Sequence, residues 1–447
     1  MRIAIVGGGI SGLTAAHLLA AAGQDVTLFD DAAEPGGLIR SERRDGFLCE
    51  RGPQAVLDGP PEVRALIEAA GLSSRVVAAA PASRRRFVYV GGALRPFPGS
   101  PPALFKTSLL SARGKLRLFA EPFVRRAAPP DPDESVFDFV ARRFGVEAAR
   151  RAAAPALIGI YAGDAKQIAA RAAFPRLGEL EEQHGSVLRG LFRSRRKDGR
   201  MGRPISFPDG LGELPRALAA QLAARRRARR IEALAPRGGA WTLAAGSESF
   251  EADRVLLATP AAITADLLAP HAADAAQALR AVPHAPVAVV TLGFRAPADA
   301  LGMDLAAYGF VVARGEGIEV LGCQYETSVF PGRAPDGTVL MRALVGGTFN
   351  PRLVDADDGP LAAQVVGDLR RAAGLHRDPD FADVWRARPG IPQYTPRHAA
   401  RITVVDGALK RLPGLFAIGH ALRGLGVAAS IRAGTAAAGT LGLTAPT

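Results

Sequence analysis

The 447-residue sequence contains few cysteines, histidines and aromatic residues, and these scarcities limit the kinds of site it can carry. Its only two cysteines, Cys49 and Cys323, are far apart and belong to no CxxC or Cys/His cluster. Neither a disulfide framework nor a zinc site is therefore expected, and a reducing compartment fits best. None of the seven histidines shows metal-ligand spacing. No metal site is predicted.

Long apolar runs are also missing. A membrane-spanning helix needs about 18 or more consecutive apolar residues, and no such run occurs without charge or glycine. The apolar N-terminal segment lacks a basic leader and is interrupted by Gly7, Gly8, Gly9 and Gly12, so it is not interpreted as a signal peptide. The expected location is the cytoplasm, and any membrane contact would be peripheral, on the inner face of the cell membrane.

The charge is strongly of one sign. A formal net charge of +13 favours an anionic partner, which could be nucleic acid, acidic lipid or a substrate with several carboxylates. The basic run Arg225–Arg230 has no interleaved aromatic residues and belongs to no recognised binding module. Nucleic acid is therefore not predicted as a partner.

The order of the expected elements indicates an α/β fold. An apolar strand at Arg2–Val6, a helix at Ser11–Ala22 and a second strand at Asp25–Phe29 form one βαβ unit. The middle of the chain loses this rhythm, and it returns later with the apolar strands Arg254–Ala258 and Gly414–Ile418. We therefore expect a discontinuous Rossmann-like domain made of residues 1–82, 204–265 and 381–447, a helical insertion at 83–203, and a mixed-sheet substrate domain at 266–380.

The first loop carries a dinucleotide-binding pattern. Gly7, Gly9 and Gly12 form GxGxxG between a strand and a helix, where glycine lets backbone N–H groups approach a pyrophosphate. Asp30 ends the next strand and is placed to accept hydrogen bonds from a ribose. The alternative is a tight turn without a ligand. NAD and FAD share this pattern, so other segments must discriminate between them.

Three later segments favour FAD. Pro35–Ser41 offers a second glycine turn, in which Arg40 could balance phosphate charge, and Glu50–Ala55 follows it. Near the end of the chain, Gly414–Gly419 and Gly424–Ala429 precede a helix whose N-terminus could face the flavin N1 and O2 edge. The alternative is that this helix only packs. Because this segment has no cysteine, FAD is expected to be bound noncovalently.

These motifs, together with others along almost the whole chain, resemble the protoporphyrinogen oxidase family within the monoamine oxidase and phytoene desaturase superfamily. The matching strings are GGGISG, PGGLIRS, ERGPQAVL, GIYAGDAKQI, FPRLGELEEQHGS, PDGLGELPRAL, ADRVLLATP, PQYTPRH and PGLFAIGHALRGLGVAASI. The two ends carry the resemblance to the superfamily, and the middle strings carry the resemblance to the family.

The motifs and the resemblance together imply a set of FAD-contacting residues. They are Gly7, Gly8, Gly9, Ile10, Ser11, Gly12, Asp30, Asp31, Gly37, Leu38, Arg40, Gly52, Pro53, Gln54, Ala55, Ala228, Trp385, Gly419, Val427, Ala428 and Ala429. The chain departs from the family pattern at Asp30, where glutamate is commoner, at Ala228, where valine often packs the adenine, and at His420, where asparagine is common.

The resemblance also implies substrate-binding residues. Arg86 matches an arginine that pairs with a substrate propionate, and Gly163 matches a glycine whose carbonyl faces the pyrrole nitrogens. Leu321 and Leu344 are expected to form apolar walls around the macrocycle, although Leu344 occupies a position that can be aromatic. A guanidinium suits this role because it binds carboxylate in bidentate geometry. The alternative is that Arg84–Arg86 is simply a solvated basic run.

By this resemblance, the chain is expected to be an enzyme that oxidises protoporphyrinogen IX to protoporphyrin IX in haem biosynthesis. Six electrons leave in three hydride transfers to the flavin N5, and oxygen reoxidises the flavin to give hydrogen peroxide. No side chain is expected to act as acid or base, because the reaction mainly needs the carbon held against N5. The alternatives are coproporphyrinogen III oxidation to coproporphyrin III, amine oxidation, and flavin binding without turnover. A homodimer is a further family expectation.

Residues 104–126 combine apolar residues at roughly helical spacing with lysine and arginine. The apolar residues are Phe105, Leu109, Leu116, Phe119 and Phe123. Such a stripe could lie on an anionic bilayer, or it could pack against the substrate domain. The family resemblance favours peripheral attachment.

Overall fold

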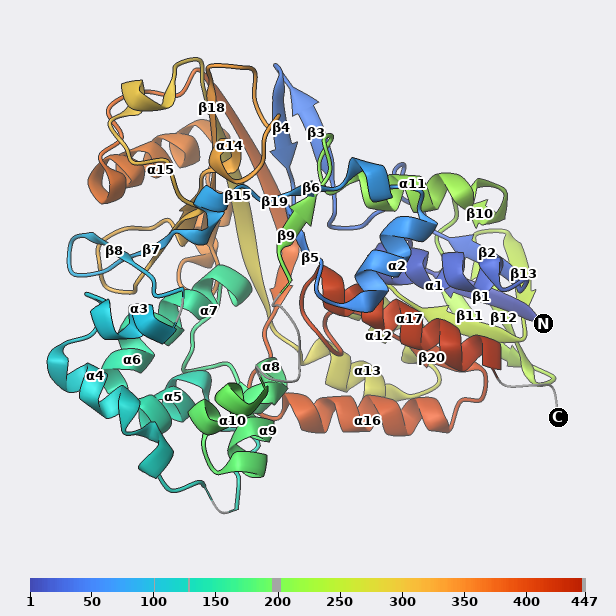
Figure 1. Ribbon diagram of the computed structural model, residues 1–447. Helices are drawn as coiled ribbons and strands as arrows, with labels where there is room; N and C mark the ends of the chain where they lie inside the picture. Colours follow the sequence, from blue (N-terminus) through green and yellow to red (C-terminus); the bar gives the residue numbers. More distant parts are fainter. Residues whose placement is uncertain (100, 128, 195–201, 444–447) are drawn as a thin grey trace.

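The computed structural model describes residues 1–99, 101–127, 129–194 and 202–443. Its cofactor-side layer is a five-stranded parallel sheet, on the right of Figure 1, built from segments far apart in the sequence. The strand order is β10 (Arg226–Arg227), β2 (Asp25–Phe29), β1 (Arg2–Val6), β14 (Arg254–Leu257) and β20 (Leu415–Ala417). Every neighbouring pair is parallel, as the βαβ pattern predicts. The Rossmann-like and discontinuous character of this fold is confirmed.

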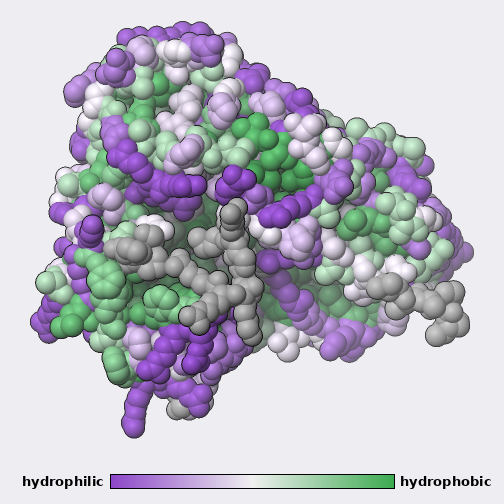
Figure 2. Space-filling view, in the orientation of Figure 1, coloured by the Kyte–Doolittle hydropathy of each residue, from purple (hydrophilic) through white to green (hydrophobic). Residues whose placement is uncertain are grey.

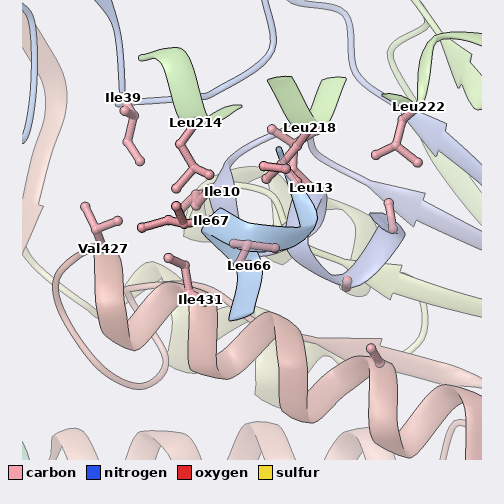
Figure 3. Packing of buried hydrophobic residues seen from close by; sticks show 14 of the residues in the cluster. Ile10, Leu13, Ile39, Leu66, Ile67, Leu214, Leu218, Leu222, Val427 and Ile431 are labelled. Atoms are coloured by element: carbon pink, nitrogen blue, oxygen red, sulfur yellow. The ribbon is translucent and has the colours of Figure 1, made fainter. Parts of the chain in front are cut away.

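Helices cover one face of this sheet. They are α1 (Ile10–Ala21), α2 (Pro61–Ala69), α11 (Glu213–Gln221) and α17 (Val427–Leu443). Figure 3 shows how Leu13 of α1 packs among Leu66, Leu214, Leu218 and Ile431 of the other three helices. Burying each such side chain contributes about 1.5–3 kcal/mol, so this face anchors the first and last parts of the chain to each other.

The opposite face is covered by a small antiparallel sheet and by further helices. The sheet contains β11 (Ala233–Arg237), β12 (Ala240–Ala245) and β13 (Glu248–Ala252). The helices are α12 (Ala261–Leu268), α13 (Ala273–Arg280) and α16 (His398–Lys410). Trp241 and Leu243 of β12 pack with Val255 and Leu257 of β14 in one buried cluster. The parallel sheet is therefore buried on both faces, as parallel sheets generally are.

A second, mixed sheet of seven strands forms the upper left lobe of Figure 1. Its order is β19 (Phe381–Pro392), β15 (His284–Phe294), β18 (Val339–Gly346), β17 (Gly322–Gln324), β16 (Gly309–Val312), β7 (Arg86–Tyr89) and β8 (Leu94–Pro96). In this sheet β16 and β7 pair in parallel, and the other neighbouring pairs are antiparallel. One face packs on α15 (Asp358–Ala373), and α14 (Glu326–Val329) lies between β17 and β18 in the chain.

The strand pairing crosses the expected domain boundaries. Strand β7 lies in the expected insertion 83–203, and β19 lies in the expected third cofactor segment 381–447, yet both are strands of the seven-stranded sheet. Two small sheets complete the connections: β3 (Ser41–Arg44) pairs with β4 (Phe47–Glu50), and β9 (Pro204–Ser206) lies between β5 (Val56–Leu57) and β6 (Val77–Ala78). The boundaries themselves stay predictions.

The helical insertion occupies the lower left of Figure 1. Its helices are α3 (Pro101–Lys106), α4 (Ala112–Phe119), α5 (Val136–Phe144), α6 (Val146–Ala148), α7 (Ala154–Tyr161), α8 (Ala170–Ala173), α9 (Pro175–His184) and α10 (Val187–Ser194). The π-helical turn Ala149–Ala153 joins α6 to α7. The short 3₁₀ turns along the chain are Ser73–Arg75, Pro81–Arg84, Glu121–Phe123, Ala223–Arg225, Ala298–Leu301 and Pro351–Asp355.

The apolar stripe predicted over residues 104–126 is divided between burial and exposure. Helices α3 and α4 and a 3₁₀ turn share it, so it forms no continuous helix. Leu109 is buried, whereas Phe105, Leu116 and Phe123 are 62%, 73% and 84% exposed. Leu109 packs with Val88 and Ala313, whereas contact of the exposed residues with a bilayer stays a prediction. Among the described residues, no helix combines the length and the apolarity that crossing a bilayer would require.

Candidate functional site

The loop between β1 and α1 is shaped to receive an anion. The first main-chain bond of α1 runs from the N–H of Leu13 to the carbonyl of Gly9 at 2.9 Å, and no side chain caps the helix. The preceding N–H groups therefore remain available at the positive end of the helix dipole. A Cβ added at Gly9 would meet no protein atom within 4 Å. The open space beside Gly9 fits a pyrophosphate.

The neighbouring glycines serve the close contact between helix and strand. A Cβ at Gly12 would lie 2.0 Å from the carbonyl oxygen of Gly7, and Gly7 itself has φ +111°. A side chain at either position is therefore excluded by the protein itself. The three glycines of the motif thus have different tasks, and only Gly9 borders open space.

Asp30 lies at the carboxyl end of β2, as predicted. Its carboxylate accepts hydrogen bonds from the N–H of Gly8 and, at 3.0 Å, from the N–H of Ala32. Its own N–H donates to the carbonyl of Arg227 at 3.1 Å, which brings Ala228 to the same edge of the sheet. A surface pocket adjoins this edge, lined by Ala33, Glu34, Pro35, Arg216, Ala219, Ala220, Ala223, Arg226 and Ala228. Asp30 therefore fixes the glycine loop while remaining at a position suited to a ribose.

The second glycine turn lies directly against the first. The N–H of Gly36 donates to the carbonyl of Gly8 at 2.8 Å, and a Cβ at Gly52 would lie 2.0 Å from the carbonyl oxygen of Leu38. The Nε of Arg40 is buried and has no hydrogen-bond partner in the described part of the chain. A half-buried arginine whose Nε lacks a partner fits a site for phosphate.

The N-terminus of α17 completes the expected cofactor segments. The N–H of Ser430 donates to the carbonyl of Gly426 at 3.0 Å, so the N–H groups of Val427, Ala428 and Ala429 precede the first turn bond. Helix α17 reaches close to α1, because a Cβ at Gly434 would lie 2.4 Å from the carbonyl oxygen of Ser11. Two helix N-termini with free donors thus belong to one packed layer, which fits FAD.

The seven-stranded sheet presents a polar row toward these cofactor segments. By strand register, Arg86, Gly309, Gln324, Arg342, Thr291 and Asp383 lie side by side across six strands. Arg342 donates to the carbonyl of Gly52 at 2.5 Å and to the Gln324 side chain at 2.6 Å. Arg51 forms an ion pair with Asp383. The segment that holds Gly52 and Gln54 is therefore docked on this row.

The next row on the same face of the sheet, two residues along each strand, is apolar. It contains Val311, Gly322, Leu344, Val289 and Trp385. Leu344 and Trp385 pack in one cluster with Leu321, Ile158 and Ala162. The structure thus brings together the two expected macrocycle walls, the expected flavin-proximal tryptophan and the residue before Gly163. Figure 2 shows that this face of the molecule is hollowed between the sheet lobe and the helical lobe.

The members of the arginine run 84–86 differ in their contacts. Arg85 pairs with Asp304 at 2.7 Å, whereas the guanidinium of Arg86 lies 4.9 Å from the ring centroid of Tyr308. Within the described residues Arg86 has no ion pair. Arg86 lies on β7, three strands from Leu344 on β18, which corresponds to roughly 14 Å across a sheet. It therefore lies apart from the apolar cluster, at the far end of the polar row.

Burial favours the neutral form of several titratable side chains. Burial raises the pKa values of Tyr161 and Tyr394, and burial also raises the pKa of Cys49 to about 12. Burial, with a smaller effect of His284, lowers the pKa of His420 to about 4. No group of three or more His, Cys, Asp or Glu residues suited to a metal ion occurs in the described ranges.

Sequence reasoning did not assign a role to several residues of this arrangement. They are Tyr308, Gln324, Arg342 and Gln393. Arg342 and Gln324 lie in the same row as Arg86 only through strand register, for which the linear sequence gives no signal. Gln393 stands in the PQYTPRH string, which the sequence analysis identified. Its contact with the carbonyl of Tyr161 could not be predicted from the sequence.

The parallel sheet, the glycine loops and the two free helix N-termini define a flavin-binding oxidoreductase. Comparisons with known proteins agree: the family model for flavin containing amine oxidoreductases matches residues 10–441. The chain belongs to the flavin-containing amine oxidoreductase family, and it is an FAD-dependent oxidoreductase.

Individual relatives are similar over nearly the whole chain. The chain is 32% identical to a chloroplastic protoporphyrinogen oxidase of Oryza sativa subsp. japonica, over 94% of this chain and 84% of the relative. It is 28% identical to the coproporphyrinogen III oxidase of Bacillus subtilis (strain 168), over 98% and 97%. A crystal structure from Exiguobacterium sp. 255-15, provisionally assigned as a protoporphyrinogen oxidase, superposes with a TM-score of 0.84 at 28% identity, covering 99% of this chain and 98% of that one.

Proposed function

We propose that the protein oxidises a porphyrinogen, with protoporphyrinogen IX as the preferred substrate and protoporphyrin IX as the product. The observation that carries this proposal is an apolar cluster, containing Leu321, Leu344 and Trp385, beside a polar row that ends at Arg86, which has no ion pair with any described residue. A flat apolar macrocycle with carboxylate arms matches this combination. The names of the relatives support the same substrate class.

The residues of the chain act on the substrate by holding it. FAD supplies a two-electron acceptor when bound. Leu321 and Leu344 exclude water from the macrocycle, while Arg86 holds a propionate in bidentate geometry. The neutral state of Tyr161 and His420 leaves no charged acid or base at these two positions. Molecular oxygen is the proposed electron acceptor for the reduced flavin.

Anaerobic mixing tests this function. The yellow protein is mixed with protoporphyrinogen IX or coproporphyrinogen III, and flavin bleaching and then porphyrin fluorescence on admitting air are followed. Faster bleaching with protoporphyrinogen IX is the expected result. Bleaching by neither compound would contradict the assignment as a porphyrinogen oxidase, and bleaching by a polyamine alone would favour amine oxidation.

Coproporphyrinogen III is the second candidate, and a specific observation favours it. Arg314 lies 3.8 Å from the ring centroid of Phe349, which packs against the cluster of Leu321 and Leu344. A second arginine near the apolar walls would suit a substrate with additional carboxylates. Preference for coproporphyrinogen III in the same assay, lost on Arg314→Ala, would establish this alternative.

Peripheral contact with an anionic membrane is also proposed, and the exposed side chains of Phe105, Leu116 and Phe123 support it. Figure 2 shows hydrophobic side chains gathered over the helical lobe at the lower left. Sedimentation with anionic vesicles is expected to retain the protein, and Leu116→Ser with Phe123→Ser is expected to release it. Val404→Ser, at another exposed apolar residue, is the matched control. Vesicle binding equal to that of the wild type in the control, and lost only in the test variant, would support this surface.

We also propose that the protein is a homodimer, and this proposal rests only on the family resemblance. Light scattering of the FAD-loaded protein measures its mass directly. A mass of twice 46.6 kDa is expected.

A further inference from the structure

The turn that ends α7 is held from three sides. The N–H of Ala162 donates to the carbonyl of Ile158 at 2.9 Å, and the carbonyl of Ala162 accepts from the N–H of Thr348 at 2.9 Å. The carbonyl of Tyr161 accepts from the side-chain amide of Gln393 at 2.8 Å. Ala162 has a left-handed φ of +48°, which is unfavourable for a residue with a Cβ and needs such support. The turn is therefore fixed by contacts from separate elements.

Within this turn, one carbonyl remains free. Those of Tyr161 and Ala162 both accept hydrogen bonds, but the carbonyl of Gly163, a buried residue, accepts none in the described part of the chain. Gly163 directly follows Ala162, which belongs to the apolar cluster of Leu321 and Leu344. Leaving a carbonyl of a buried residue without a hydrogen bond costs free energy, and the pyrrole N–H groups of the proposed substrate are donors.

Gln393 contacts the same turn with both ends of its amide. It is only 2% exposed, and its N–H₂ group donates to the carbonyls of Tyr161 and, at 2.9 Å, Ile391. These two bonds fix which way the amide faces, and they leave Oε1 buried without a partner. That oxygen occupies the place of a side chain at residue 163, since a Cβ on Gly163 would lie 2.1 Å from it.

We propose that Gln393 is a positioning residue for substrate binding, which sets the direction of the Gly163 carbonyl and makes glycine obligatory at position 163. This inference rests on the proposed function, because the carbonyl is directed at a donor on the porphyrinogen. Gln393 is itself anchored, since its N–H donates to the carbonyl of Pro283 at 2.8 Å. It thereby couples the end of β19 to the turn after α7.

A double-mutant cycle tests the contact. Gly163→Ala is expected to slow anaerobic flavin reduction by protoporphyrinogen IX about 100-fold, because the new methyl group displaces the turn from Gln393. Gln393→Ala is expected to slow it roughly tenfold and to raise KM, since the turn loses its support. The double variant is expected to reduce its flavin faster than Gly163→Ala alone, because the shortened side chain makes room for the methyl group.

Gln393→Glu provides the matched comparison. It keeps the size of the side chain but removes both donors, so combined with Gly163→Ala it is expected to give no rescue. Gln364→Ala and Gly367→Ala on α15 serve as controls, because a Cβ at Gly367 would meet no atom within 4 Å. FAD content, the visible spectrum and reduction by dithionite are expected to stay unchanged in every variant that folds.

The unfolding free energies of the same proteins give a readout that needs no substrate. If Gly163→Ala destabilises the protein less in the Gln393→Ala background than in the wild type, the contact between residues 163 and 393 is supported. If the effects of the two substitutions add, both on stability and on reduction rate, the contact is overturned. A wild-type flavin that no porphyrinogen reduces would contradict the proposed function and the role of Gln393 in that reaction. The stability cycle would then still report whether Gln393 restrains residue 163.

Discussion

Glu50 and Arg333 form an ion pair of 3.1 Å whose side chains are 0% and 1% exposed. The Glu50 carboxylate also accepts from the N–H of Leu211 at 2.9 Å, and Arg333 also donates to the hydroxyl of Ser206 at 2.7 Å. This pair therefore joins the cofactor-side segment that precedes Gly52 to a loop of the substrate-side lobe.

Removing one member of this pair is expected to destabilise the protein. Arg333→Met leaves the Glu50 carboxylate buried without its counter-charge, which typically costs about 3–5 kcal/mol. Urea denaturation of the apoprotein measures this cost. Adding Glu50→Gln to Arg333→Met is expected to recover part of the loss, and equal stability of wild type and Arg333→Met would contradict the buried pair.

The second and third glycines of the cofactor loop, Gly9 and Gly12, are expected to respond differently to alanine. Gly9→Ala meets no protein atom, so the variant should fold normally but bind FAD at least about tenfold more weakly, because the methyl group fills space needed by the phosphates. Gly12→Ala forces the new Cβ onto the Gly7 carbonyl and should destabilise the apoprotein as well. Thermal unfolding with and without FAD separates the two cases. Retention of normal FAD affinity by Gly9→Ala would exclude this loop as the phosphate site.

Substitution of Arg86 is expected to affect substrate more than cofactor. Arg86→Ala removes a guanidinium that forms no ion pair within the described ranges and should raise KM for the porphyrinogen roughly tenfold or more, whereas FAD content should not change. Arg85→Ala is the matched control, because Arg85 already pairs with Asp304. Steady-state kinetics at constant ionic strength measure both. A larger increase in KM for Arg85→Ala than for Arg86→Ala would indicate that Arg85 binds the carboxylate instead.

His420 is expected to make stability depend on pH. Burial lowers its folded pKa to about 4, below the unfolded value of about 6.5, so the fold prefers the neutral imidazole. The stabilisation is complete above pH about 6.5 and is lost as the pH falls toward 4, by up to about 3 kcal/mol. His420→Asn should flatten this part of the profile. His284 and His398, whose pKa values are also lowered by burial, should keep contributing in the same direction.

The cofactor side of the fold was predictable because its signals are local. The strand, turn and helix around Gly7, Gly9 and Gly12 need only a few consecutive residues, and Asp30 follows at the end of the next strand as expected. The C-terminal helix was also visible from its preceding glycines, and it begins at Val427. In such segments the glycine positions and the apolar periodicity agree with the final packing.

The substrate side depends on information that the linear sequence does not contain. Arg86, Gln324 and Arg342 share one row only because four strands pair in one register, and a shift by one residue would turn each side chain to the other face. The apolar stripe at 104–126 followed helical spacing, yet tertiary packing broke it into short helices and buried Leu109 while exposing Leu116. Contacts between distant segments overrode local periodicity there.

The scattered origin of the five-stranded sheet affects when the protein can become active during its synthesis. Strand β20 forms one edge of that sheet, and α17, which begins at Val427, packs against α1. A nascent chain that already exposes the complete glycine loop on the ribosome still lacks both elements. Retention of the flavin must therefore await synthesis of β20 and of α17, which ends at Leu443, so that a flavin-free chain precedes the loaded protein in every copy.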